Sequence, residues 1–298
     1  MVEVLGPWVW VTLAAAAVQT ARFMLQKRLK GLGLSTGGAT FSRFLFGAPI
    51  AGLAAAVLMV SRGYALPELP ARFWVFALGG GAAQVTATFL TVALFSLRNF
   101  AVGVAFTKTE TVQVALFSAV ILGETLPAPA LAAIGVGVLG VGLLSGAQGG
   151  GFDRRAALYG IGAGALFGVS AIGYRGATLA LDLPAPEARA LLALAFVTAA
   201  QALGMALWLR WREAGELARV VAAWRRTIWV GVTGVAGSAL WFTAFALENA
   251  ARVRALGQIE IVFTLLVSAL VFRERLHLRE GVGIALVVLS VIGIVLAR

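Results

Sequence analysis

The chain has 298 residues, of which 60% are hydrophobic and only 12% are charged. A soluble domain of this length could not bury so much apolar surface, so the composition predicts a protein whose solvent is lipid. Cysteine is absent and histidine occurs once, at His277, which excludes disulfides, thiolate metal sites and histidine clusters; we expect no metal and no cofactor. The net charge of +11 does not indicate a nucleic-acid partner, because most of the 24 basic residues stand in short segments between apolar runs.

Ten apolar runs are long enough to cross a membrane, which takes about 20 residues of helix. In chain order their approximate bounds are 6–26, 37–60, 72–97, 101–122, 128–147, 156–181, 187–209, 226–247, 253–272 and 279–297. A short polar segment, GGGFDRR, separates the fifth run from the sixth. We therefore expect a five-helix repeat over residues 1–148, a linker over 149–155 and a second five-helix repeat over 156–298.

The two halves share a sequence pattern at a constant offset of 150 positions. The stretch 108–126 corresponds to 258–276, so that Glu110 matches Glu260. Matched leucines are common by chance in apolar chains, but matched glutamates are rare there and indicate an internal duplication. Because each half has an odd number of spans, the second half inserts in the opposite direction. The predicted fold is an all-α integral membrane protein with ten transmembrane helices, arranged as two inverted five-helix repeats.

Several charged residues fall inside the predicted spans, where a charge at the bilayer centre costs about 2.5–3.5 kcal/mol on insertion scales. Arg22, Arg43, Lys108 and Glu110 fall toward one side of the membrane, and Arg175, Arg189 and Glu260 toward the other. Two clusters on opposite sides of one centre are what two gates require. Two interpretations stay open: the glutamates pair with Arg43 and Arg189 as gates, or they carry a coupling proton. For Arg22 and Arg189, which lie near span ends, the alternative is snorkelling to the membrane surface.

Neutral polar residues accompany the two glutamates. Gln113 lies one helical turn from Glu110, and Thr264 lies one turn from Glu260. Gln258 precedes Glu260 by two positions, in the place that a lysine takes in the first half. An acidic group beside neutral polar groups can hold a small polar or amphipathic solute, so we count all these residues as candidates for substrate binding or gating.

Two further side chains stand out by their positions. Trp241 is the one tryptophan well inside a predicted span, so we expect it to line the solute path; the alternative is a packed tryptophan bonded to a neighbouring helix. Glu124 and Glu274 end the fourth and ninth spans, and we expect them to cap their helices or to pair with loop residues.

Short sequence motifs add a family resemblance. They are Gly123-Glu124-Thr125-Leu126, Arg273-Glu274-Arg275-Leu276, Arg43 early in the second span and Lys27 near the end of the first. With these motifs and its ten spans, the chain resembles the EamA-type branch of the drug/metabolite transporter superfamily over nearly its whole length. Members often carry a Glu-Pro pair about a dozen residues before the glutamate that ends the span. Glu110 and Glu260 fit the glutamate of this pair, but Thr111 and Ile261 replace the proline, so no proline kink is expected.

Loop charges and the resemblance give different orientations. The predicted loops place 14 basic residues on one face and 5 on the face that carries both termini: Arg62, Arg72, Arg252, Arg254 and Arg298. Because cytoplasmic loops are usually the basic ones, this bias predicts termini outside the cytoplasm. The resemblance implies termini inside the cytoplasm, so the orientation stays open.

Together these observations predict a secondary active transporter of the cell inner (plasma) membrane. We expect it to move a small organic solute, such as an amino acid, a metabolite or an amphipathic drug, by alternating access and in the direction of export. Its partners would be the solute, the lipid bilayer and a coupling ion such as H+, and it would act as a monomer or homodimer. The alternatives are an intramembrane enzyme that uses Ser118 or Ser268 with Lys108, and a membrane scaffold without a solute path.

Overall fold

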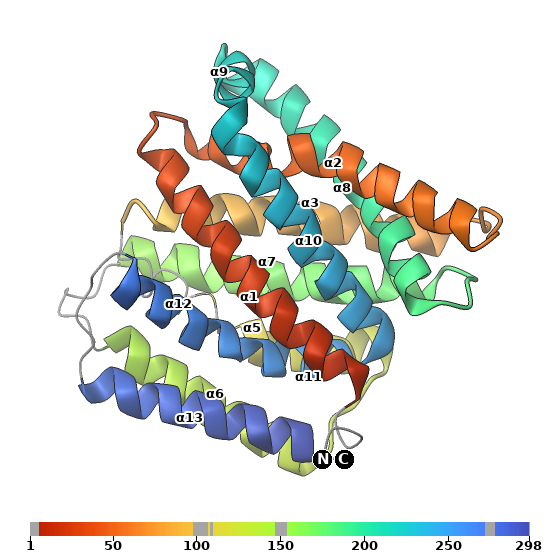
Figure 1. The fold of residues 1–298 in the computed structure, drawn as a ribbon. Helices are drawn as coiled ribbons and strands as arrows, with labels where there is room; N and C mark the ends of the chain where they lie inside the picture. Colours follow the sequence, from red (N-terminus) through yellow and green to blue (C-terminus); the bar gives the residue numbers. More distant parts are fainter. Residues whose placement is uncertain (1–5, 98–106, 108–109, 147–153, 272–277, 298) are drawn as a thin grey trace.

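The computed structural model describes residues 6–97, 107, 110–146, 154–271 and 278–297, and all regular secondary structure in these ranges is helical (Figure 1). Six helices are long and apolar enough to cross a membrane. They are α1 (Pro7–Lys30), α2 (Thr36–Ser61), α3 (Ala71–Leu94), α7 (Arg154–Leu179), α8 (Pro186–Arg212) and α10 (Trp224–Leu247).

Shorter helices complete the described fold. They are α5 (Glu110–Phe117), the π-helix η3 (Ser118–Leu122), α6 (Ala128–Gly146), α9 (Glu216–Ala222), α11 (Ala250–Leu256), the 3-10 helix η4 (Gly257–Ile259), α12 (Glu260–Leu270) and α13 (Leu278–Leu296). Three shorter apolar helices, Glu110–Leu122, Ala128–Gly140 and Gly281–Leu296, lie within the predicted fourth, fifth and tenth spans and cover only part of each. The predicted ninth span is helical from Ala250 to Leu270, with one 3-10 turn, η4, between α11 and α12.

Local sequence explains several helix ends. Pro7 and Pro186 open α1 and α8, where a missing backbone N–H is tolerated and the fixed φ suits the first turn. The Ser35 hydroxyl accepts a hydrogen bond from the Gly38 amide at 2.9 Å and so caps α2. Gly123 ends η3 with a φ of 69°, a left-handed conformation that glycine adopts at little cost.

The long helices pack in pairs that join the two halves of the chain. In Figure 1, α1 lies along α10, α3 along α7 and α2 along α8, while α6 and α13 form a separate pair at the lower edge. The main hydrophobic core gathers side chains from α3, α7, α8 and α10, among them Phe73, Ile172, Leu194 and Phe242. Helix α1 begins and α13 ends on the same side of the molecule.

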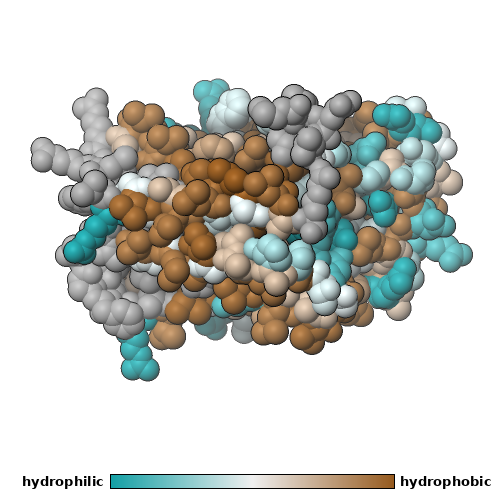
Figure 2. Space-filling model, turned by 90° about the horizontal axis from the view of Figure 1, so that it is seen from below, coloured by the Kyte–Doolittle hydropathy of each residue, from teal (hydrophilic) through white to brown (hydrophobic). Residues whose placement is uncertain are grey.

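The outer surface of the helices is apolar. Large aliphatic side chains such as Leu53 and Val60 on α2 and Leu203 and Leu207 on α8 are exposed. Figure 2 shows apolar side chains across the middle of one face, with hydrophilic side chains gathered toward its right-hand end. Helices that are apolar on both their inner and their outer faces are expected in lipid, which agrees with the predicted multi-pass membrane protein.

Candidate functional site

The centre of the molecule contains an ion pair between the two halves of the chain. Glu110, the first residue of α5, is 3% exposed, and Arg254 on α11 is 5% exposed. Arg254 Nη1 lies 3.5 Å from Glu110 Oε1. Of the two interpretations left open for Glu110, the gate interpretation paired it with Arg43; in the structure its partner is Arg254 instead.

Arg254 also contacts the first of several aromatic and polar side chains that are linked to one another. Its guanidinium lies 4.5 Å from the centre of the Trp241 ring, on α10, in cation–π geometry. Trp241 Nε1 donates to Gln19 Oε1 on α1 at 3.0 Å, and Gln19 Nε2 donates to Glu260 Oε2 at 2.8 Å. We call Glu110, Arg254, Trp241, Gln19 and Glu260 the polar chain. It crosses the bundle from α5 to α12 and is buried throughout.

Helix α11 and the 3-10 turn η4 that follows it hold part of the polar chain in place. Asn249 caps α11 by accepting a hydrogen bond from the Ala251 amide at 2.8 Å. Gly257 then lets the backbone pass directly over Trp241, since a Cβ at this position would lie 2.6 Å from the indole ring. The backbone makes one 3-10 turn and continues into α12 at Glu260 with right-handed helical angles throughout.

Two other buried guanidiniums lie beside this chain. Arg22 Nη1 donates to Gln26 Oε1 at 2.6 Å, and its guanidinium lies 4.2 Å from the centre of the Phe23 ring. Arg43 donates to Thr88 Oγ1 at 3.1 Å and to Ser238 Oγ at 2.9 Å. Arg22 is 2% exposed, so it does not snorkel to the surface.

Contacts between the halves also occur near both ends of the bundle. Arg175, near the end of α7, donates to Glu124 Oε1 at 2.6 Å and to the Phe245 carbonyl at 2.5 Å, and the Ser118 hydroxyl donates to Glu124 Oε2 at 2.9 Å. We call this the terminal-face contact, because it lies on the side where α1 begins. The ion pair of Glu124 with a residue of α7 replaces the expected cap or loop partner.

The opposite end holds a second set, which we call the basic-face contact. The Ser35 amide donates to Glu216 Oε1 at 2.6 Å, and the Ser35 hydroxyl donates to Glu213. Glu216 is fully buried and also pairs with Arg219. The start of α2 is thereby tied to α8 and α9.

The remaining predicted site residues are less closely connected. Gln258 and Thr264 are buried near Glu260, and neither side chain has a hydrogen-bond partner among the described residues. Gln113 is half-buried on α5. The expected pair of Arg189 with Glu260 does not form: Arg189 is half-buried near the start of α8, and Glu260 accepts from Gln19. Lys108 and Glu274 lie outside the described residues.

Two members of the polar chain were missed by the sequence analysis. Arg254 was counted as a loop charge, because it lies close to the end of a predicted span. Gln19 is a polar residue in the middle of the first apolar run, three positions before Arg22. Residues at this spacing share a helix face, so the pair could have indicated the buried side of α1.

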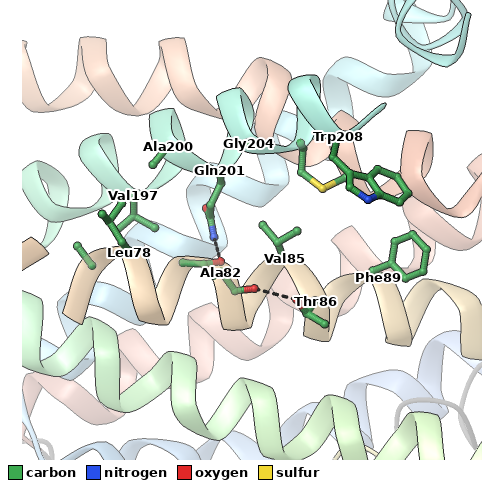
Figure 3. Close-up of a pocket in the computed structure, with 13 residues that line it drawn as sticks. Leu78, Ala82, Val85, Thr86, Phe89, Val197, Ala200, Gln201, Gly204 and Trp208 are labelled. Atoms are coloured by element: carbon green, nitrogen blue, oxygen red, sulfur yellow. Dashed lines mark hydrogen bonds between the residues drawn. The ribbon is translucent and has the colours of Figure 1, made fainter. Parts of the chain in front are cut away.

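A cavity of about 500 Å³ lies between α3 and α8 (Figure 3). Its lining is apolar apart from Gln201, which donates to the Gly81 carbonyl across the gap at 2.9 Å, and Thr86, whose hydroxyl bonds the carbonyl of its own helix. None of the buried charges lines it, so we place the functional site at the polar chain rather than in this cavity. No group of three or more acidic, histidine or cysteine side chains within the described ranges could hold a metal ion.

Comparison with known proteins agrees with this architecture. A model of the EamA-like transporter family matches residues 154–296. A crystal structure described only as that of a protein is similar with a TM-score of 0.65 and 21% sequence identity, and the match covers 95% of this chain and 99% of that one; at this identity the likeness shows the fold alone. No curated protein matches the sequence. Through its second half the chain therefore belongs to the EamA-like transporter family of the drug/metabolite transporter superfamily, which confirms the resemblance seen in the sequence.

Proposed function

We propose that the protein is a secondary active transporter that moves a small organic solute across the membrane by alternating access. The observation that carries the proposal is the polar chain, which joins Glu110 to Glu260 through the middle of the bundle. Charged groups are costly inside a membrane and usually mark solute or ion pathways. A scaffold would gain nothing from them.

The pairing of helices supports two inverted repeats, residues 1–148 and 156–298. In two repeats, each span of the first half corresponds to the span with the same rank in the second half. The first spans are α1 and α7, and the third spans are α3 and α10. The pair α1–α10 then becomes the pair α7–α3, and both pairs are extensive contacts. The pairs α2–α8 and α6–α13 each map onto themselves. Any two-fold axis that relates the two halves produces this contact pattern, and an odd number of spans in each half would put that axis in the membrane plane.

The two end contacts are suited to serve as gates. Ser35 meets Glu213 and Glu216 on the basic face, and Glu124 meets Arg175 on the terminal face. Each contact joins one half of the chain to the other, so each must break if the halves rock apart at that end. The proposed gates thus differ in their partners from the pairs expected from sequence.

Transport would proceed by opening one end contact at a time around the polar chain. A solute that inserts between Glu110 and Arg254 would replace their ion pair. A proton taken up by Glu110 or Glu260 would weaken the polar chain and so couple solute movement to a proton gradient. We propose export of an amino acid, a metabolite or an amphipathic drug from the cell across its inner membrane. The enzyme alternative finds no support, since the Ser118 hydroxyl is bonded to Glu124.

The test is solute uptake by purified protein in liposomes, with and without a pH gradient. We expect the native protein to transport at least one amino acid or amphipathic amine, and the Arg254→Gln variant to lose transport. The exposed Arg155→Gln serves as the control and should retain it. Equal flux through the native protein and Arg254→Gln would contradict the proposal, and chemical conversion of the solute would favour the enzyme alternative.

A further inference from the structure

Two buried guanidiniums next to the polar chain have only neutral hydrogen-bond partners among the described residues. Arg22 bonds the Gln26 amide oxygen, and Arg43 bonds the hydroxyls of Thr88 and Ser238. Arg22 Nη2 has no hydrogen-bond partner in the described part of the chain. A guanidinium remains charged in a protein, so each of these side chains carries a full positive charge in the interior.

The two side chains lie next to each other across Gly234 on α10. A Cβ at Gly234 would lie 2.9 Å from Arg43 Cγ and 3.7 Å from Arg22 Cδ. The missing side chain at this position therefore gives both arginines room on the same surface of α10. Like charges held close together in a low-dielectric interior repel each other strongly, unless an anion lies between them.

The carboxylates nearby do not balance this charge. Glu110 is paired with Arg254. Glu260 is close enough to attract Arg22 electrostatically, but no ion pair of 4.0 Å or less joins them. The described buried charges of the site are thus three guanidiniums and two carboxylates. Because an uncompensated buried charge is strongly unfavourable, the surplus indicates a negative group that the site receives from outside.

We propose that Arg22 and Arg43 bind an oxyanion, a carboxylate or a phosphate, on the transported solute. Guanidinium groups present parallel N–H donors that match the two oxygens of such a group. The free Nη2 of Arg22 supplies one donor, and the Thr88 and Ser238 hydroxyls can rotate to donate as well. This inference names the cargo class and rests on the proposed transport function.

Ligand-dependent thermal unfolding of the purified protein tests the site without measuring transport. The probes are 3-phenylpropanoate, its neutral counterpart 3-phenylpropanamide, and inorganic phosphate. A ligand that binds only the folded state raises the unfolding temperature as its concentration rises. We expect the unfolding temperature to rise with 3-phenylpropanoate or with phosphate and not with the amide. The anion that raises it more identifies the oxyanion as a carboxylate or a phosphate. An equal rise with the amide, or no rise with either anion, would overturn the proposal.

Variants connect the response to the two arginines. In Arg22→Met and Arg43→Met we expect anion binding to weaken at least about tenfold, because charge-assisted hydrogen bonds are lost. Without anion, these variants should be no less stable than the native protein, since each removes an uncompensated charge. If a methionine variant fails to fold, Arg22→Lys keeps the charge and should retain a weakened response. A full response in Arg22→Met would contradict the assignment.

Transport and binding can fail separately. Anion-dependent stabilisation without any flux in liposomes would leave the anion site in place and refute the proposed function. Flux of a neutral or cationic solute, without any effect of the anions on unfolding, would leave the function in place and refute the anion site.

Discussion

At the residue scale, the ion pair between Glu110 and Arg254 joins the two halves of the chain in the interior. Both side chains are almost completely buried, so neither can be solvated once its partner is removed. We expect Glu110→Gln to destabilise the protein by about 3–5 kcal/mol, the usual cost of leaving one charge of a buried pair alone. Exposed Glu187→Gln should change the unfolding temperature little.

The double variant Glu110→Gln, Arg254→Met distinguishes this pair from simple loss of packing. Because both charges are gone, it should recover much of the stability lost in Glu110→Gln. Thermal unfolding of the two single variants and the double variant gives the coupling energy. Additive losses would show that the two side chains do not interact.

Trp241 combines two roles that separate variants can distinguish. Its ring stacks against Phe245 and lies under Arg254, and its N–H holds Gln19. Trp241→Phe keeps a ring and removes the donor, which should cost about 1–3 kcal/mol through the unsatisfied Gln19 oxygen. Trp241→Ala should also change the order of preference among transported solutes. A loss of folded protein with unchanged preference would show that Trp241 only packs.

The sequence indicated some of these residues and could not indicate their partners. Glu110, Glu260 and Trp241 were recognisable because polar or large aromatic residues are rare in the middle of apolar runs. Which arginine meets Glu110 depends on how α11 packs against α5 in the folded bundle, and no periodicity encodes that arrangement. Arg254 is only the second residue of the predicted span 253–272, so position alone made it look like a loop charge.

At the element scale, close backbone contact holds α3 against α7. A Cβ on Gly173 would lie 2.6 Å from the Gly80 Cα and 2.7 Å from the Phe76 carbonyl oxygen. Small residues are what permits helices to approach this closely in lipid, where the hydrophobic effect contributes little to association. The two apolar runs predict both helices, but nothing in the runs predicts that these helices pair.

Gly173→Ala therefore must push α3 and α7 apart, and we expect a lower unfolding temperature. Gly79→Ala is the matched control: it lies on α3 beside Gly80, and nothing lies within 4 Å of its added Cβ. In a helix, alanine is favoured over glycine by about 1 kcal/mol, so the control should be neutral or slightly stabilising. Equal effects of the two substitutions would contradict the close contact.

At the scale of the whole molecule, the distribution of basic residues predicts one orientation in the membrane. The burial of Arg254 removes one basic residue from the less basic face, which carries the termini, and so increases the bias. A bias of this kind directs every copy to insert the same way. Reporters active only inside or only outside the cell, fused after Arg298, should give one strong and one weak signal. Comparable activity from both would indicate mixed insertion.

Alternating access is the central claim, and it predicts that the two end contacts control opposite sides of the same site. The absence of native cysteine makes Ser238→Cys, beside Arg43, the only thiol in the protein. The decisive measurement is the labelling of this thiol by a membrane-impermeant reagent, applied from each side in turn. We expect Glu216→Gln to increase labelling from the basic face and Arg175→Gln to increase labelling from the terminal face. Labelling that rises from both sides in either variant, or changes in neither, would contradict alternating access.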